Sequence, residues 1–418
     1  MTSQASLSPL GPPPLPPQVR RARGAAFIFM LSAGVTAASL FVRTPALRDL
    51  IQASIAEMGL VLFGLSVGSM AGILSSSAIV RAIGARRVVA LGSAFFVLGL
   101  ATVGVLAVSG SAGVFAGLVM VGLGFGLSEI AINLEGAAME AASGRTMLTT
   151  IHGFFSLGSV LGAGTGIAMT QLGVPITAHL CTVAVLCAIA LALALPRLPR
   201  ATGRTPADAP NRADRSGWRA QLAVWKQPRI VLLGIVVLCL ALAEGSASDW
   251  LPLLMVDGHG TSPTAGSIVF TAFAVAGTIG RFLGAPLLAR FGRVTVLRAS
   301  ALVLATGIAF VIFSDNILIA GGAVLLWGLG AALGFPVTLS AAGDSEDPTT
   351  TVSAVATAGY TAFLVGPPLL GFLGEHLGLR PAMTVVLAAV LIAATLATAA
   401  RVRSPRRSSR LAFSRRAG

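Results

Sequence analysis

The chain has 418 residues, a mean hydropathy of +0.88 and only 11% charged side chains. Proteins average about 25% charged residues, so this composition excludes an ordinary soluble domain, whose surface needs far more charge. The net charge of +14 comes from short basic clusters between apolar stretches, which argues against a nucleic-acid-binding patch. The composition is that of a polytopic α-helical membrane protein with the lipid bilayer as its surroundings.

Apolar stretches recur along the chain, and each is long enough to cross about 30 Å of hydrocarbon. Twelve transmembrane helices are predicted, at residues 24–44, 55–80, 88–108, 113–141, 147–172, 175–196, 229–252, 264–289, 294–314, 317–340, 351–374 and 380–400.

One long polar stretch divides the spans six and six, which predicts two helical bundles. The expected organisation is a Pro-rich, disordered cytoplasmic tail (1–23), an N-terminal six-helix bundle (24–196), a cytoplasmic linker (197–228), a C-terminal six-helix bundle (229–400) and a basic cytoplasmic tail (401–418).

The two halves repeat each other weakly. Gly84 and Gly292 follow the second and eighth spans, 208 residues apart. Gly122-Leu-Gly124 in span four and Gly328-Leu-Gly330 in span ten are 206 apart. Two pseudo-symmetric six-helix repeats are typical of secondary transporters that rock around a central site. The repeat predicts a cavity lined by spans 1, 4, 7 and 10.

The distribution of basic residues predicts the orientation, because cytoplasmic loops retain Lys and Arg. With the N-terminus inside, all but four of the 29 basic residues fall on the cytoplasmic side. The exceptions are Arg43, Arg48 and Arg380 outside and Arg281 within a span. The protein is therefore expected in the inner or plasma membrane, with both termini cytoplasmic.

Over residues 24–400 the chain resembles the major facilitator superfamily. The mark of that family after the second span is Gly-x-x-x-Asp-Arg-x-Gly-Arg-Arg, a cytoplasmic latch between helices. Here Gly84, Arg86 and Arg87 match the pattern, and Arg81 stands where the acid is expected. The resemblance implies the twelve-helix fold, alternating access and a gating or structural role for these arginines.

Within the superfamily the chain is similar to the fucose-permease-like branch, which includes bacterial inner-membrane proteins of unassigned substrate. The matching stretches are 128–133 in span four, 151–158 in span five, 244–250 in span seven and 359–368 in span eleven. Sugar–proton symporters of that branch have an acid and, four residues later, an Asn in span four, matched by Glu129 and Asn133. They also have an acid in span one, where this chain has none. The resemblance implies a sugar-like solute and a coupling proton.

Glu129 is the strongest candidate for function. A charge at the centre of a membrane helix costs about 2.5–3.5 kcal/mol even on insertion scales, so such residues default to function. Gly122, Gly126, Glu129 and Asn133 share one face at helical spacing, which we interpret as a cavity wall. Glu129 is expected to carry a proton; the alternative is a structural hydrogen bond to a neighbouring helix.

Three further polar residues are assigned to the solute and proton pathway, each with a structural alternative. Glu244 in span seven suits a substrate contact, a second proton site or a partner for a cation. His152 lies near the start of span five, where a histidine suits either a transport role or a plain hydrogen bond. Tyr360 precedes a Gly366-Pro367-Pro368 break in span eleven, where a kinked helix with a packed ring is the alternative.

The remaining charged candidates are given gating or structural roles. Arg281, in the inner half of span eight, is expected to form an ion pair. Asp249 and Trp250 fall at the outer end of span seven, where Trp belongs in an interfacial belt and Pro252 is expected to end the helix.

No nucleotide-binding motif, metal-ligand spacing or nucleophile–base arrangement is present, so neither an enzyme nor a metal or cofactor is expected. Cys181, Cys187 and Cys239 lie within spans and are interpreted as packing residues. The favoured function is proton-coupled symport of a small polar solute by a monomer. The alternatives are a proton-linked efflux antiporter of drugs or metabolites, and a membrane sensor or scaffold that does not transport.

Overall fold

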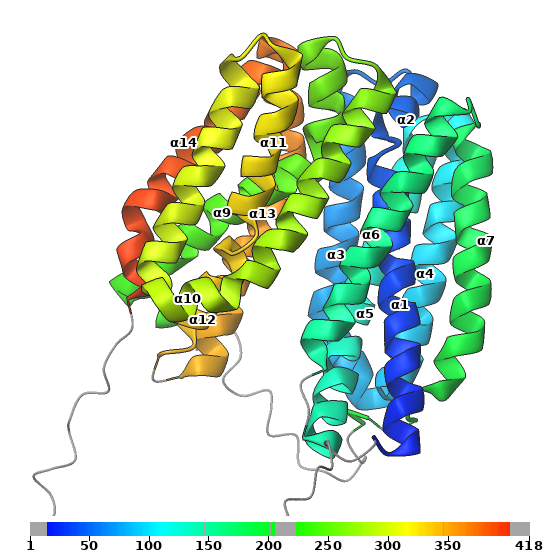
Figure 1. The fold of residues 1–418 in the computed structure, drawn as a ribbon. Helices are drawn as coiled ribbons and strands as arrows, with labels where there is room; N and C mark the ends of the chain where they lie inside the picture. Colours follow the sequence, from blue (N-terminus) through cyan, green and yellow to red (C-terminus); the bar gives the residue numbers. More distant parts are fainter. Residues whose placement is uncertain (1–14, 145–146, 201, 205–222, 346, 402–418) are drawn as a thin grey trace, which may run out of the picture. The chain divides into compact units, whose positions relative to one another are not determined.

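The computed structural model describes residues 15–144, 147–200, 202–204, 223–345 and 347–401 (Figure 1). In this part of the chain, eleven helices are long and apolar enough to cross a membrane. One of them, α10 (Pro263–Phe313), is interrupted at Gly292, where φ is +74°, and contains the predicted eighth and ninth spans. The twelve predicted spans are therefore confirmed.

The chain divides into two compact units, residues 1–209 and 210–418. In the first unit a short helix and two 3₁₀ turns accompany six spans. The elements are α1 (Pro17–Phe41), α2 (Thr44–Ile51), α3 (Ile55–Ile83), α4 (Ala85–Leu106), η1 (Ala107–Ser109), α5 (Ser111–Ser143), α6 (Leu148–Gln171), α7 (Ile176–Ala194) and η2 (Leu195–Arg197).

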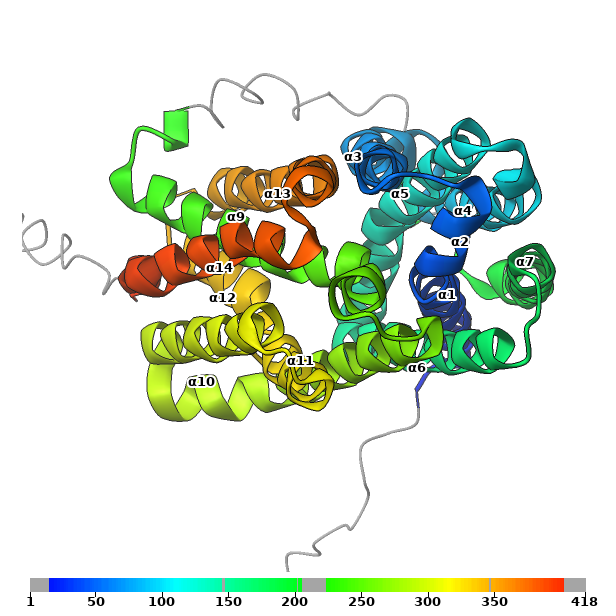
Figure 2. The same ribbon diagram turned by 90° about the horizontal axis from the view of Figure 1, so that it is seen from above.

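In the second unit, α9 passes into a π-helical turn, and α11 and α12 together form the tenth span. The elements are α9 (Pro228–Leu253), η3 (Leu254–Gly258), α10, α11 (Ile317–Ala331), α12 (Gly334–Ala342), α13 (Pro348–Leu377), α14 (Leu379–Leu396) and η4 (Ala397–Ala400). The end-on view shows the helices of each unit side by side (Figure 2).

Some element boundaries differ from the prediction. Helix α1 begins at Pro17, so the helical segment starts before residue 24; proline suits this position because it lacks the N–H that a first turn leaves unpaired. Most of the predicted linker and nearly all of the C-terminal tail lie outside the described residues, as does the N-terminal tail up to residue 14.

The prolines do not end the helices as predicted. Helix α9 continues through Pro252 and is followed by the wider π turn, which accommodates a backbone ladder that proline has disturbed. Helix α13 runs unbroken through Pro367 and Pro368, so the predicted break in span eleven is absent.

The repeated glycines have the same structural role in both units. A Cβ added to Gly122 would lie 2.7 Å from a backbone nitrogen of α3, and one added to Gly328 would lie 3.1 Å from a backbone nitrogen in the first half of α10. At the second glycine of each pair, Gly124 or Gly330, an added Cβ would lie 2.5 Å from a backbone nitrogen of α4 or of the second half of α10. Each pair thus brings two helix backbones into direct contact with a third, as small residues do in membranes.

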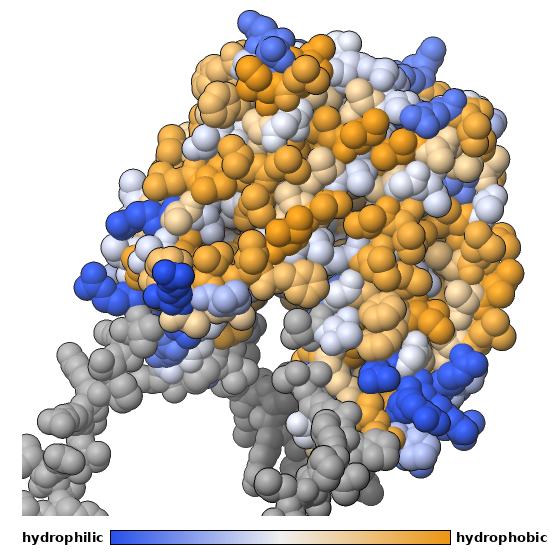
Figure 3. Space-filling view, viewed as in Figure 1, coloured by the Kyte–Doolittle hydropathy of each residue, from blue (hydrophilic) through white to orange (hydrophobic). Residues whose placement is uncertain are grey.

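The outer surface of the helices suits a lipid environment. On the face shown in Figure 3, hydrophobic side chains cover the middle of the helices and hydrophilic ones gather near their ends. Leu186, Ile189 and Leu193 on α7 are more than half exposed, as are Phe282 and Phe313 on α10. Such exposure of large apolar side chains is costly in water and favourable in hydrocarbon.

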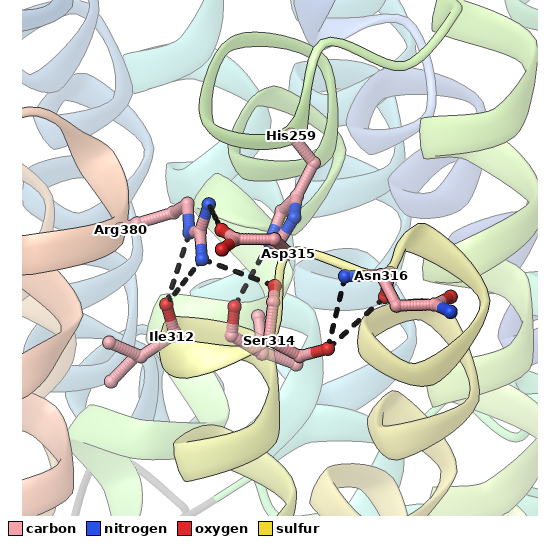
Figure 4. A network of polar contacts seen from close by, with 7 residues as sticks. His259, Ile312, Ser314, Asp315, Asn316 and Arg380 are labelled. Atoms are coloured by element: carbon pink, nitrogen blue, oxygen red, sulfur yellow. Dashed lines mark hydrogen bonds and ion pairs between the residues drawn. The ribbon is translucent and has the colours of Figure 1, made fainter.

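A polar network that the sequence did not reveal holds the C-terminal end of α10 (Figure 4). Arg380, near the start of α14, donates to the carbonyl oxygens of Ile312 and Ser314 at 2.8–3.1 Å and pairs with Asp315 at 3.0 Å. The His259 Nε2 atom lies 3.0 Å from the Val311 carbonyl oxygen. Arginine and histidine therefore satisfy carbonyls that a helix end leaves unpaired.

Acid should weaken this network. Burial and the nearby Arg380 guanidinium lower the pKa of His259, despite opposing contributions from Val311 and Asp315. Because the folded pKa lies below the unfolded value, neutral His259 contributes stability above the unfolded pKa, and this is lost as pH falls through the folded pKa. We expect His259→Gln, which keeps an N–H donor, to reduce the fall in melting temperature between about pH 7 and about pH 5.

The matched control is His376→Gln, since His376 is exposed and its Nδ1 donates to the Phe372 carbonyl oxygen of its own helix. If the melting temperature falls equally with acid in His259→Gln and in the unsubstituted protein, the assignment to His259 is wrong.

Candidate functional site

Three of the predicted pathway residues lie together in the first unit. The Asn133 Nδ2 atom donates to Glu129 Oε1 at 3.1 Å, one turn back on α5. The His152 Nε2 atom of α6 lies 2.9 Å from Asn133 Oδ1. Because the Asn133 nitrogen faces Glu129, its oxygen is left to accept, so the proton of His152 sits on Nε2. The result is a directed hydrogen-bond chain from His152 through Asn133 to Glu129.

The small-residue face of α5 is not the cavity wall that the sequence indicated. Gly122 and Gly126 pack against α3, where added Cβ atoms would meet backbone atoms of Leu65, Ser69 and Ile73. The glycines therefore serve helix contact. Glu129 and Asn133 continue the same face beyond this contact and remain partly exposed.

Glu244 and Arg281 form an ion pair in the second unit. Arg281 Nη2 lies 2.7 Å from Glu244 Oε1, joining α9 to α10. The side chains are 50% exposed for Arg281 and 23% exposed for Glu244. The sequence placed Glu244 in the outer part of its span and Arg281 in the inner half, but the contact means that their charged ends share one level.

Asp249 and Trp250 differ from their predicted setting. Trp250 is 0% exposed, so it does not belong to an interfacial belt, and its Nε1 has no hydrogen-bond partner among the described residues. Asp249 is also buried. The reason is that the helical path continues to Gly258, which leaves both residues inside the unit and away from the helix end.

Tyr360 packs as an aromatic residue in the second unit. Its ring centroid lies 5.9 Å from that of Phe335 on α12, and the neighbouring Gly359 leaves room for the same Phe335 ring. The ring contact agrees with the structural alternative for Tyr360, a packed aromatic ring, but the helix that carries it is unbroken.

A family model matches most of the chain. The model of the Major Facilitator Superfamily matches residues 24–356 and 233–417. The chain belongs to the major facilitator superfamily. It is accordingly a multi-pass membrane protein and a secondary transporter, because the members of this superfamily are transporters and not enzymes.

Two curated proteins that this superfamily member resembles are described only as uncharacterized transporters. The chain is 31% identical to an uncharacterized MFS-type transporter of Yersinia pestis over 349 residues, which are 83% of this chain and 86% of the relative. Among solved structures, a D-xylose–proton symporter matches with a TM-score of 0.72 at 12% identity, covering 93% of this chain and all of that one. The E. coli fucose:proton symporter matches at a TM-score of 0.59 and 18% identity, covering 92% and 98%. These two likenesses show the fold.

The latch of the superfamily is built differently in the two units. In the second unit Arg293, just after Gly292, forms an ion pair with Asp344, near the end of span ten. In the first unit Arg81, Arg86 and Arg87 form no ion pair with any described residue.

A buried acid at the corresponding end of span four was missed by the sequence analysis. Glu135 is 0% exposed and accepts from Thr202 Oγ1 at 3.0 Å, while the Thr202 carbonyl accepts from Ala85 N–H at 2.9 Å. Its other oxygen, Oε1, has no partner among the described residues. Ala85 follows Gly84 where Arg293 follows Gly292, so the first unit joins its latch loop to span four through Thr202 in place of an arginine. Hydropathy could not reveal the contact of Glu135, because its partner Thr202 lies in the predicted linker.

Proposed function

We propose that the protein is a proton-coupled symporter of a small polar solute, working by alternating access between its two six-helix units. The observation that carries the proposal is the hydrogen-bond chain of Glu129, Asn133 and His152. It joins two titratable groups, one on span four and one on span five. The cost of keeping such groups in a membrane helix favours a use for them.

Glu129 is proposed as the proton carrier. As a carboxylate it accepts the Asn133 N–H; when protonated it becomes neutral and gains an O–H donor for solute. The loaded protein then closes without an isolated charge in a dry site. Asn133 cannot pass a proton along, so its amide serves to fix the orientation of the Glu129 and His152 side chains.

Polar stripes on two equivalent spans support a water-accessible path. Helices α6 and α13, the fifth and eleventh spans, are the least apolar of the candidate spans. Helix α6 carries exposed His152 with partly exposed Ser156 and Ser159, and α13 carries exposed Ser353 and Thr357. Exposed hydroxyl rows are unfavourable toward lipid and are expected to face water.

A proton-flux assay tests the proposal without a labelled solute. Purified protein is reconstituted with a pH-sensitive dye inside the vesicles, and candidate sugars, polyols, amino acids and organic acids are added outside. Symport acidifies the lumen on addition of the right solute, whereas a proton-linked antiporter makes it alkaline. A pH change in neither direction with any solute that the protein binds would favour the sensor alternative.

We further propose that both termini face the cytoplasm of the cell membrane and that the transporter works as a monomer. A reporter that is active only in the cytoplasm should work when fused after Arg401 or near Arg212, and should fail near His259. Activity of the His259 fusion would overturn the orientation. A single-copy mass in native detergent particles is the expected result for a monomer.

A further inference from the structure

We infer that Arg281 binds the carboxylate of the solute, so that the transported compound is a small organic anion. The inference rests on the proposed transport function and names its substrate class. It starts from the 2.7 Å contact between Arg281 Nη2 and Glu244 Oε1, in which the two side chains are 50% and 23% exposed.

The contact uses only a small part of what Arg281 offers. A guanidinium has five N–H donors in a planar fork, and a single Nη2 contact occupies one of them. Arg281 Nε and Nη1 make no hydrogen bond with the described residues. An open guanidinium edge matches the two oxygens of a carboxylate, which it binds through two parallel hydrogen bonds.

The depth of Arg281 excludes a lipid headgroup as its natural partner. It precedes Gly292 by eleven residues, or about 16 Å of helix at 1.5 Å per residue, which is half the thickness of the hydrocarbon. A three-methylene stem cannot carry the guanidinium from there to the interface. A half-exposed guanidinium at this depth requires water or a bound anion, because hydrocarbon offers neither acceptors nor hydration.

The internal repeat indicates that the Glu244–Arg281 ion pair is not needed to hold the fold together. The glycine pairs of spans four and ten, which bring helices together, occur in both units. At the same offsets, Glu244 corresponds to the segment 36–38 and Arg281 to the segment 73–75, and neither segment contains a charged residue. The first unit packs the equivalent helices without an ion pair, so the fold does not require one here.

Glu244 acts as a positioning residue in this scheme. It holds one Nη2 N–H and so orients the open edge of the guanidinium. Its negative charge also opposes an incoming carboxylate, which keeps binding weak enough for release. Ser248, one turn further on, donates to the Glu244 carbonyl oxygen, so its hydroxyl oxygen is left to accept a hydrogen bond from the solute.

The test uses probe pairs that differ in one carboxylate. Galacturonate is compared with galactose, gluconate with glucitol, and lactate with propane-1,2-diol, each acid as its potassium salt against an equal concentration of KCl. Binding to the purified full chain is measured at equilibrium from the shift in melting temperature across a concentration series. We expect at least one acid to stabilise the protein while its neutral partner does not.

Two substitutions locate the effect. Arg281→Gln should weaken binding of that acid by about tenfold or more, since hydrogen bonds to a charged group are lost. Glu244→Gln should strengthen binding, because the amide oxygen still accepts from Arg281 while the opposing charge is removed. A merely structural ion pair predicts lower stability in both variants and no change in acid affinity. The Glu244→Gln/Arg281→Gln double variant removes both charges and leaves neither one unpaired, so it replaces Arg281→Gln in the comparison if the single variant folds poorly.

Three results would overturn the inference: equal shifts by an acid and its neutral partner, an acid affinity unchanged in both Arg281 variants, or no shift with any of the acids. The open N–H donors of Arg281 can pair with any small carboxylate that reaches them, so at least one of these acids should bind. The proposed symport fails differently, through absence of solute-driven acidification in vesicles. Acid binding without acidification would retain Arg281 as the anion site and remove the proton coupling.

Discussion

Glu129→Gln is expected to bind and exchange solute but to lose all accumulation against a gradient. The glutamine keeps the shape of the protonated side chain and its contact with Asn133, but it cannot release a proton. With one proton per solute, a gradient of one pH unit supports about tenfold accumulation of solute at equilibrium. In Glu129→Gln the internal and external solute concentrations should instead become equal, because the proton no longer contributes.

The measurement is solute uptake into proteoliposomes with and without an inward proton gradient, together with counterflow in the absence of a gradient. Glu244→Gln is the internal comparison, since its carboxylate is engaged by Arg281 and is expected to affect coupling less. Undiminished gradient-driven accumulation in Glu129→Gln would refute Glu129 as the proton carrier and direct attention to Glu244.

Gly330→Ala should cause the largest loss of stability among the single substitutions considered. A Cβ at this position would lie 2.5 Å from Leu304 N and 2.6 Å from Ser300 O, both backbone atoms that cannot move aside. Forcing a methyl group into a close contact of this kind costs about 1–3 kcal/mol or more. We expect a sharply lower melting temperature and a smaller yield of monodisperse protein.

Gly322→Ala is the matched control, because it lies in the same helix and an added Cβ would have no neighbour within 4 Å. Both changes carry the same benefit of about 0.5–1 kcal/mol from alanine's higher helix propensity. The difference in melting temperature between the two variants therefore measures the cost of the close contact at Gly330. Equal melting temperatures would show that helix α11 has room to separate from its neighbours.

Hydropathy and charge were sufficient to predict the spans, because lipid demands long apolar helices wherever the chain crosses it. The repeated glycines could also be recognised in the sequence, since backbone contact between membrane helices requires small residues at defined intervals. Both signals are local in the sequence. They predicted which segments cross and that the two halves repeat each other, whereas the helix contacts made by Gly122 and Gly126 are seen in the structure.

The sequence was less informative about side chains whose setting depends on a distant segment. Trp250 was assigned to the interface from its place near Pro252, but the helical path continues to Gly258 and encloses it. Glu135 was passed over because its partner, Thr202, belongs to a stretch that hydropathy marks only as polar. The Glu129–Asn133 spacing was visible, whereas the contact with His152 required the two helices to be placed.

The single-residue turn at Gly292 has a consequence for biogenesis. Spans eight and nine are joined by Gly292 with Arg290 and Arg293 beside it, and no loop separates them. Two spans joined so tightly are expected to enter the bilayer as one helical hairpin, and the proposed orientation leaves the basic turn on the cytoplasmic side. The ninth span has no charged residue after Arg298, whereas the eighth contains Arg281. The more apolar member of the hairpin thus offsets the insertion cost of its partner, and the charge reaches the membrane interior together with the helix that makes its entry favourable.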